Sequence, residues 1–154
     1  MAGEQIVRGA EYMERQIGWG KKTDDGIFDL SGRDVKVHQE TVTLAQLNAG
    51  KTLVPEVGGR TYNVVGFWVK FNGTFTTATD IRLSDTNGTP VDILTIAIAQ
   101  AGDGVTHALG VGTHTLGTLF ANLTASKGIQ IRKTGSDAAG GTDIRVGVLY
   151  QITT

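Results

Sequence analysis

Cysteine is absent from this 154-residue sequence, and proline and aromatic residues are scarce. Without cysteine, the chain can form neither a disulfide framework nor a thiolate metal site. With only 6% aromatic residues, a hydrophobic core must be built mainly from Val, Ile, Leu and Ala. The net charge of −1 excludes the basic excess that draws proteins to nucleic acid.

Long hydrophobic runs are missing as well. Residues 1–19 lack the apolar segment of a secretory signal, and no run in the chain approaches the length that spans a bilayer. We therefore expect neither a membrane partner nor a nucleic-acid partner.

Glycine is abundant, with 22 copies against two prolines. Glycines scattered among Thr, Asp and Asn supply the turns that an all-β protein needs. The length suits one domain with a possible appendage, and the apolar fraction of 40% can sustain one core.

The most hydrophobic aromatic-bearing stretch is Thr61–Phe71 (TYNVVGFWVKF), which holds four of the ten aromatic residues. Val65, Phe67, Val69 and Phe71 alternate as one apolar face of a strand. The even-numbered positions from 62 to 70 form the second face, which is also largely apolar. We expect a central strand whose second face is covered by a second sheet, another chain segment or another subunit.

Other short strands follow from residue 37 onward. Thr43 and Gln46 have the spacing of a capping box for one helical turn that ends at Gly50. Val91–Ala99 is nearly continuously apolar and is expected to be buried on both faces, whereas residues 135–141 are expected to form a loop. About eight strands with frequent turn signals indicate an antiparallel sandwich or barrel. The further strands are expected at Val37–Thr43, Lys51–Val57, Thr79–Ser84, Thr106–Val111, Ile129–Lys133 and Thr142–Thr153, and Leu116–Thr124 is either strand or helical turn.

The N-terminal residues differ in composition from the rest. Residues 1–36 carry 13 charged residues, against 16 in the remaining 118. One interpretation is a disordered tail, and the other is an extended arm that becomes ordered when it docks, because aromatic residues are typical anchors at interfaces. We predict an arm over residues 1–37 and a β-sandwich domain over residues 38–154. The candidate partner contacts are Ile6, Tyr12, Met13, Ile17, Trp19 and Phe28 in the arm, and Trp68 in the domain.

No catalytic or metal-binding group can be assembled from the sequence. His107 and His114 match no metal-ligand spacing and are expected to be solvated loop residues. Asp80, Asp85 and Asp92 flank a hairpin and are expected to face solvent, where Arg82 can pair weakly with them. We expect no cofactor, no metal and no enzymatic activity.

Several stretches together resemble the small capsid decoration proteins of tailed bacteriophages, also called cement or head-stabilising proteins. The resemblance covers residues 38–154 and consists of strands and turns rather than a catalytic signature. The stretches are Val42–Pro55, Gly59–Val65, Ala78–Pro90, Leu123–Gly135 and Tyr150–Thr153.

The resemblance implies a β-rich, often trimeric protein that sits on the outside of a capsid and clamps neighbouring major capsid subunits. We therefore expect an all-β, jelly-roll-like sandwich with an extended N-terminal arm. Its partners would be the major capsid protein and further copies of itself, and it would be made in the cytoplasm of a bacterial host and act in the virion. A rival interpretation is a receptor- or carbohydrate-binding module of a phage fibre or head appendage, which would use Trp68.

Overall fold

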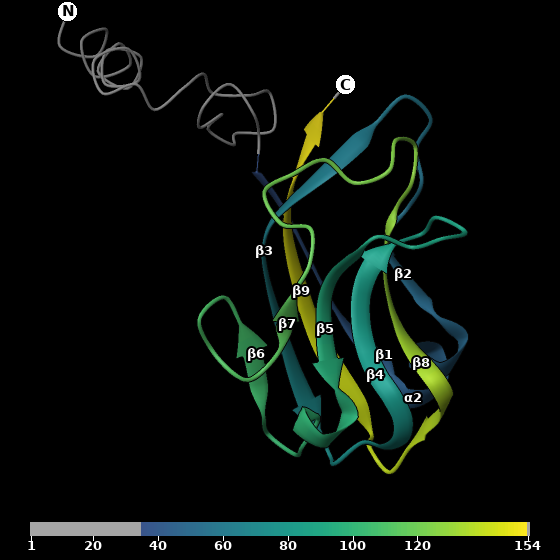
Figure 1. Ribbon diagram of the computed structural model, residues 1–154, viewed down its shortest axis with the longest axis vertical. Helices are drawn as coiled ribbons and strands as arrows, with labels where there is room; N and C mark the ends of the chain where they lie inside the picture. The colour runs from purple at the N-terminus through teal and green to yellow at the C-terminus, as the bar shows by residue number, and fades with distance from the viewer. Residues whose placement is uncertain (1–34, 154) are drawn as a thin grey trace, which may run out of the picture. The chain divides into compact units, whose positions relative to one another are not determined.

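The computed structural model describes residues 35–153, which fold into two antiparallel sheets packed face to face (Figure 1). The strands are β1 Val35–Thr43, β2 Lys51–Val54, β3 Thr61–Asn72, β4 Thr76–Asp85, β5 Asp92–Ala97, β6 Thr106–Ala108, β7 Thr115–Leu116, β8 Ile129–Ala139 and β9 Asp143–Thr153, and the helical segments are α2 Leu44–Ala49 and the 3₁₀ turn η1 Ile98–Gln100.

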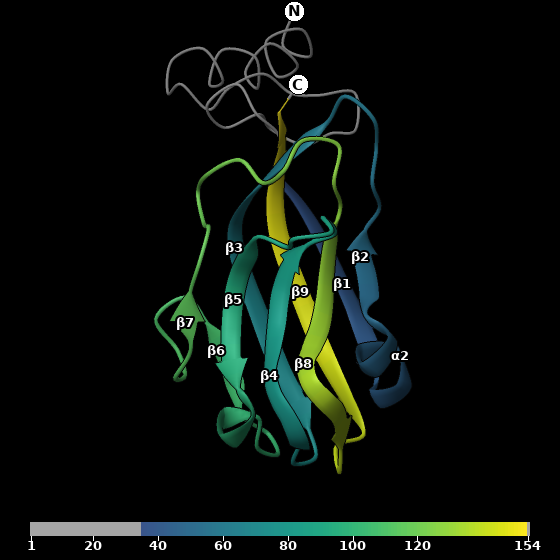
Figure 2. The ribbon, with the colours of Figure 1, turned by 45° about the vertical axis from the view of Figure 1, so that its right-hand side comes forward.

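The strand order is that of a jelly roll. One sheet has the order β1-β9-β3-β6, and the other has the order β2-β8-β4-β5-β7. In each sheet, a strand from the C-terminal part of the chain lies between two strands from the N-terminal part: β9 between β1 and β3, and β8 between β2 and β4. Without the short β7, each sheet has four strands, as in a double-sheet jelly roll. Figure 2 shows β6 and β7 along one side of the sandwich and β1, β2 and α2 along the other. The predicted all-β antiparallel sandwich is therefore confirmed for the described residues.

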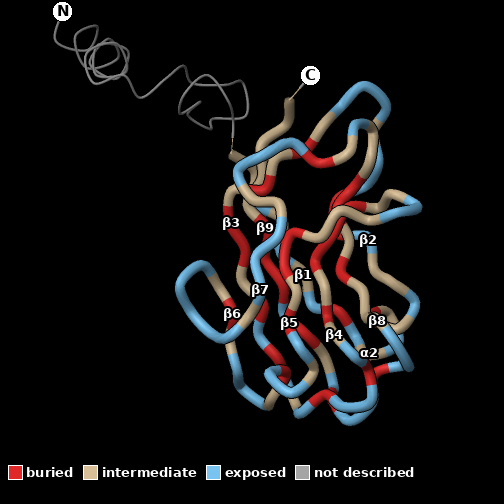
Figure 3. Tube along the Cα trace, viewed as in Figure 1, coloured by how far each residue is buried: buried red, intermediate tan, exposed pale blue. Residues whose placement is uncertain are grey.

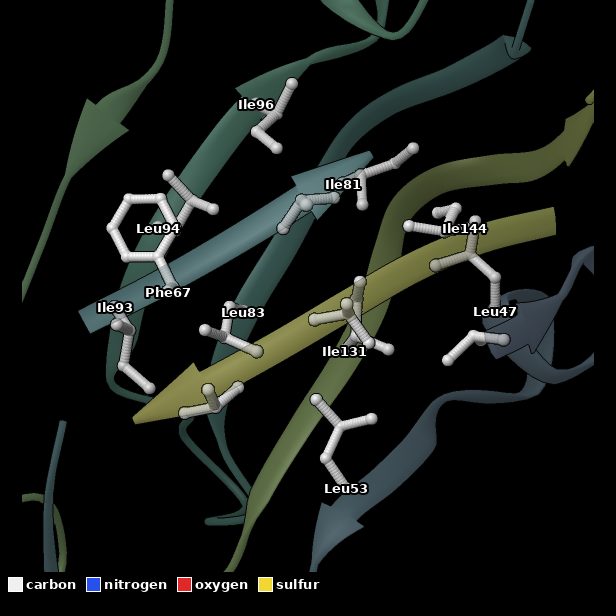
Figure 4. Close-up of a cluster of buried hydrophobic side chains, with 14 of the residues drawn as sticks. Leu47, Leu53, Phe67, Ile81, Leu83, Ile93, Leu94, Ile96, Ile131 and Ile144 are labelled. Carbon is white, nitrogen blue, oxygen red and sulfur yellow. The ribbon is translucent and has the colours of Figure 1, made fainter. Parts of the chain in front are cut away.

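The core lies between the sheets, where buried positions alternate with exposed ones along the strands (Figure 3). Figure 4 shows isoleucine and leucine side chains of β4, β5, β8 and β9 meeting there, with Leu47 of α2 and Leu53 of β2 closing one side. Burying one such side chain fully stabilises the fold by about 1.5–3 kcal/mol. The aliphatic core expected from the composition is present, with Phe67, Phe71 and Phe75 among its larger members.

A β-bulge in β3 changes which residues of the central strand face the core. The pairing of β3 with β9 shifts by one residue between Val64 and Gly66. Tyr62 and Val64 are buried before the shift, and Phe67 is buried after it. The prediction that Tyr62 and Val64 lie on the second face is therefore wrong. Because the bulge moves the buried set from even to odd positions, both sets look apolar in the sequence.

A second irregularity affects β5. Ile93 and Leu94 are both buried, since the pairing of β4 with β5 shifts beside them. Thr95 is only half-buried and Ala97 is exposed, so burial on both faces, as predicted for residues 91–99, is wrong. The strand also ends at Ala97, where η1 begins.

The other strand boundaries differ from expectation in a few places. The predicted loop at residues 135–141 is mostly strand, because β8 continues to Ala139 beside the first half of β4. Gly135 has a φ of +72° at a shift in that pairing, a conformation that glycine adopts without strain. The segment 116–124 contributes only the end of β7.

The predicted capping box is confirmed at the start of α2. The Thr43 hydroxyl accepts a hydrogen bond from the Gln46 backbone N–H at 3.3 Å, and the Gln46 side chain accepts one from the Thr43 N–H at 2.9 Å. Gly50 ends the helix with a φ of +81°. Leu47 is thereby held in the core against β8.

Asp85 is buried rather than solvent-facing, which contradicts the expectation from its place in a hairpin. Its carboxylate accepts backbone hydrogen bonds from Asn87 at 3.2 Å, Val91 at 2.9 Å and Thr124 at 3.3 Å. The Asp85 carbonyl also accepts from the Gln130 amide at 2.7 Å. One residue therefore ties the β4–β5 turn to the segment that leads into β8.

Replacing Asp85 with Ala should lower the free energy of unfolding by about 3 kcal/mol, because three backbone N–H groups lose their acceptor inside the protein. Urea unfolding of the full chain measures this loss. The matched control is Asp103→Ala, since Asp103 is exposed and, within residues 35–153, its side chain accepts one backbone hydrogen bond, from Gly73. If both variants lost the same free energy of unfolding, the proposed role of Asp85 in joining the β4–β5 turn to the segment before β8 would be contradicted.

Candidate binding surface

Of the predicted contact residues, only Trp68 lies in the described part of the chain. Ile6, Tyr12, Met13, Ile17, Trp19 and Phe28 lie outside the described residues, as does most of the predicted arm. The structure therefore bears on one candidate contact, and the surface around it is built below from its neighbours.

Trp68 lies in the middle of β3, between the partner strands β9 and β6. It pairs with Gly147 of β9 on one side and with Ala108 of β6 on the other. The residue is half-buried, while its neighbours Phe67 and Val69 point into the core. Trp68 thus belongs to the outer face of the β1-β9-β3-β6 sheet.

Gly147 provides the space that the Trp68 indole occupies. A Cβ atom at residue 147 would overlap the indole nitrogen and its neighbouring ring carbons. A similar arrangement occurs at the bulge, where Leu149 lies in van der Waals range of the position that a Gly66 Cβ would take. The indole therefore lies close against the backbone of β9 instead of standing out from the sheet.

Two shallow hollows open on this part of the structure, of about 340 Å³ and about 300 Å³. Arg145 of β9 borders both of them. The larger hollow is lined by Gln39, Glu40, Thr41, Trp68 and Arg145, and the smaller by Lys70, Phe71, Asn72, Asp103, Gly104 and Arg145.

Two cations lie side by side here. Lys70 and Arg145 are directly opposite each other in the β3–β9 pairing, and both are exposed. No ion pair within residues 35–153 involves either of them. Like charges at directly opposed positions destabilise a sheet. The pair therefore costs stability unless an anion lies beside it.

The nearby carboxylates are occupied by other partners. Glu40 forms an ion pair with Lys51 at 2.9 Å and contacts His38 at 3.2 Å. Burial alone would raise the pKa of Glu40, but the hydrogen bonds from Lys51 and His38 outweigh it, and the net effect lowers the pKa. Asp103 accepts the Gly73 backbone N–H at 2.7 Å. Asp143, which is opposite Asn72 in the β3–β9 pairing, accepts a hydrogen bond from the Asn72 side chain at 3.1 Å. The surface around Trp68 therefore combines two cations that form no ion pair within residues 35–153 with carboxylates that are held by other groups.

The outer face of the other sheet carries a charge-balanced network instead. Arg82 binds Asp80 at 2.8 Å and Asp92 at 2.5 Å, and Arg132 binds Asp92 at 3.0 Å. The hydrogen bond that Arg82 donates to Asp80, followed by the charge of Asp92, raises the pKa of Arg82 despite its partial burial. The predicted pairing of Arg82 is confirmed for Asp80 and Asp92 but not for Asp85, whose carboxylate binds backbone N–H groups. The network joins β4, β5 and β8, and its two arginines balance its two carboxylates.

The histidines of the glycine-rich stretch form part of a ring cluster. His107 is fully buried, and its Nε2 lies 3.1 Å from the Gln100 carbonyl oxygen. Its ring packs edge-to-face against Phe71 and His114, and His114 packs likewise against Phe67. The expectation of solvated loop histidines is therefore wrong for His107. The cluster fastens the β6–β7 segment to β3, and no group of three metal-ligating side chains occurs in the part of the chain that the structure describes.

Exposed apolar side chains recur along the segment that carries β6 and β7. This segment runs beside β3 from the Phe71 end, where the Val105 carbonyl accepts a hydrogen bond, to the Val64 end, where the Phe120 N–H donates one. Five of the six large hydrophobic residues that are exposed within residues 35–153 fall between residues 105 and 120, and they are 37–64% exposed. Figure 3 shows the loop beyond β6 as exposed. We call this group the edge patch: Val105, Leu109, Val111, Leu116 and Phe120.

Sequence reasoning missed the edge patch because its members lie among glycine and threonine, where no strand period is visible. The only available signal was that apolar residues persisted in a glycine-rich stretch. Sequence reasoning also missed that Arg145 and Lys70 lie opposite each other. This pairing depends on the register between β3 and β9, which the sequence of one strand does not reveal. None of the helices described is long and apolar enough to cross a membrane.

A Gly147→Ala substitution should displace the Trp68 indole and lower the free energy of unfolding by about 1–3 kcal/mol through overpacking. Tryptophan fluorescence should shift to the red as the ring moves into water. Gly88→Ala is the control, because nothing lies within 4 Å of an added Cβ there. Unchanged fluorescence and stability in Gly147→Ala would contradict the placement of the ring.

Acidification should weaken the fold through His114. Burial, and then the nearby His107, lowers the pKa of His114 below its ordinary value of 6.5. The unfolded chain therefore takes up the proton more readily, and stability falls as the pH drops below 6.5 toward the lowered pKa. Urea midpoints of the wild type should decline across this range.

The variant His114→Phe, which keeps a ring beside Phe67, should show a shallower decline. The lowered pKa values of Glu40 and Glu56 act below 4.5, outside this range. An identical pH slope in variant and wild type would exclude His114 as a source.

Comparisons with known proteins identify no family for this chain. No protein-family model matches it, and a search of curated proteins finds no match. Among solved structures, a chain of the cyanophage Pam1 capsid asymmetric unit is similar with a TM-score of 0.47 and 22% sequence identity, over 77% of this chain and 85% of that one. At these values the likeness adds nothing to the assignment of fold or function, which depends on the strand order and the surfaces described above.

Proposed function

We propose that this chain is a structural protein of a tailed-bacteriophage virion, which binds the outer surface of the capsid and bridges major capsid subunits. In this role it is not an enzyme, needs no cofactor and contacts neither nucleic acid nor membrane. It is made in the cytoplasm of the host bacterium and acts on the capsid surface. The observation that carries the proposal is the edge patch, a set of exposed apolar side chains along the β6–β7 side of the sandwich, which contact with another polypeptide would remove from water.

The resemblance to decoration proteins is compatible with this proposal. The sequence stretches that carry the resemblance form strands and turns of the sandwich. Val42–Pro55 spans the end of β1, α2 and β2, and Ala78–Pro90 spans β4 and the turn after it. Leu123–Gly135 leads into β8 and is joined to that turn through Asp85. The stretches that carry the resemblance therefore form the sandwich fold itself. A fold does not specify a function, so the function has to be argued from the surfaces of the protein.

The physical effect of such a protein is to stabilise an assembled shell. A molecule that binds only the assembled state lowers its free energy relative to a swollen or burst state by mass action. Many symmetric copies repeat this gain over the shell, which would oppose the pressure of packaged DNA.

The edge patch supports self-association into a homotrimer. β6 and β7 are terminal strands of their sheets and run along the same side of the sandwich (Figure 2). Apolar side chains beside two open sheet edges favour contact with another polypeptide. A stable contact requires roughly 800 Å² from each partner, and the edge patch contributes exposed apolar side chains on the side of the sandwich where we propose this contact.

Placing charges in the edge patch should therefore abolish self-association. The double variant Val111→Glu, Leu116→Glu is expected to sediment as a monomer where the wild type sediments as a trimer, because burying two carboxylates is costly. Val37→Glu is the control, since Val37 is 63% exposed and lies in β1, outside the patch. A wild type that is monomeric both in solution and on particles would contradict the trimer.

Attachment to the capsid is assigned to the N-terminal arm with its anchors Tyr12, Trp19 and Phe28. Since β1 begins at Val35, a deletion of residues 1–34 removes the arm and spares the sandwich. The truncated chain should keep its β-type circular dichroism spectrum and nearly its thermal midpoint, yet bind particles far more weakly. Trp19→Ala should reproduce part of that loss, because buried aromatic anchors carry much of an interface's energy.

Purified virus particles provide the decisive measurement. The full chain should co-purify with them in a copy number that is a multiple of three, and particles without it should release DNA at a lower temperature. Absence of the chain from particles would overturn the proposed function. If the truncated chain decorated particles at full occupancy, the arm would lose its role; if it unfolded, residues 1–34 would be part of the folded body.

A further inference from the structure

The surface around Trp68 combines an aromatic ring with Lys70 and Arg145, two cations that form no ion pair within residues 35–153, and it differs in kind from the edge patch. We propose that it binds a saccharide that carries carboxylate groups, with Trp68 as the stacking platform and Arg145 and Lys70 as the carboxylate partners. This inference does not depend on attachment to a capsid.

Size and chemistry favour a small polar ligand over a protein segment. The two hollows measure about 340 Å³ and about 300 Å³, and small-molecule sites begin at roughly 300 Å³. Protein contacts need a broad surface with an apolar centre, and the exposed apolar side chains of this structure lie mainly in the β6–β7 segment. Around Trp68 the linings are mostly polar or charged.

Trp68 supplies the flat apolar surface that a sugar ring needs. Its indole lies against the backbone at Gly147, so the ring is fixed before a ligand arrives and loses little conformational freedom on binding. An aromatic ring combines a large apolar area with a polar N–H edge. The C–H side of a pyranose can pack on this surface while its hydroxyls reach the side chains of Gln39 and Thr41 at the rim.

Arg145 and Lys70 supply the charge selection. They are opposed in the β3–β9 register without an ion pair among the described residues, so an anion between them relieves their repulsion. The guanidinium of Arg145 can hold a carboxylate with two parallel hydrogen bonds. Arg145 borders both hollows, which places it between two successive sugar units.

Glu40 is the one carboxylate among the described residues that line the larger hollow, and its ion pair is with Lys51 and not with Arg145. Lys51 and His38 lie within 2.9 Å and 3.2 Å of its oxygens. Asp103, at the smaller hollow, is held by the Gly73 N–H. A neutral saccharide would leave Arg145 and Lys70 unpaired, so the surface should prefer an acidic one.

Titration of the full chain with trigalacturonate at low salt tests the proposal. Binding should quench tryptophan fluorescence and weaken as salt is added. Arg145→Gln and Lys70→Gln should each reduce the affinity at least about tenfold, while the control Lys127→Gln, which removes a cation whose described partner is Glu56, should not. Maltotriose, a neutral trisaccharide of equal length, should bind much more weakly than trigalacturonate.

The contribution of the indole is tested with Trp68→Ala and the milder Trp68→Phe, followed by calorimetry. Affinity should fall strongly in the first and partly in the second, and the Phe variant keeps the test valid if the Ala variant fails to fold. Absence of trigalacturonate binding, or binding that Arg145→Gln leaves unchanged, would overturn the proposal. Equal binding of maltotriose would remove the acidic preference, and tighter binding of an oligoglutamate peptide would assign the surface to an acidic protein segment instead.

Discussion

The single extra residue in the pairing of β3 with β9 is the constraint on which much of the structure depends. Before the shift between Val64 and Gly66, even-numbered residues of β3 face the core; after it, odd-numbered residues do. Without the shift, Phe67, Val69 and Phe71 would point outward and Trp68 would point into the core. Because of the bulge, Tyr62, Phe67 and Phe71 of β3 pack in the core, while Trp68 of the same strand lies on the outer face of the sheet.

Glycines on the neighbouring strand make that presentation possible. The Trp68 indole uses the space beside Gly147, and Leu149 lies over Gly66, so each of these two side chains covers a position without a Cβ on the other strand. This reciprocal packing holds both side chains against the sheet. An exposed tryptophan thus becomes a fixed, half-buried surface, which suits recognition better than a freely rotating ring does.

Patterns among residues that are close in sequence predicted much of this fold. The features that were not predicted depend on contacts between residues that are far apart in sequence. Strand alternation, turn signals and the Thr43–Gln46 capping box depend on neighbours in sequence, and they are confirmed. Bulges depend on register with a distant strand, which explains the wrong faces in β3 and β5. The burial of Asp85 and His107 depends on loops that fold over them, and the opposed Lys70 and Arg145 could not be read from one strand alone.

The two candidate surfaces share a strand but differ in what they can bind. β6 pairs with Trp68 through Ala108, and Leu109, the next residue, belongs to the edge patch. Exposed apolar side chains follow this short strand, while the sheet beside it carries an aromatic ring and two cations that form no ion pair within residues 35–153. The ring cluster of His107 and His114 holds the segment to the core. A jelly roll specifies none of these features, so the function of this chain has to be argued from its edge and its outer face.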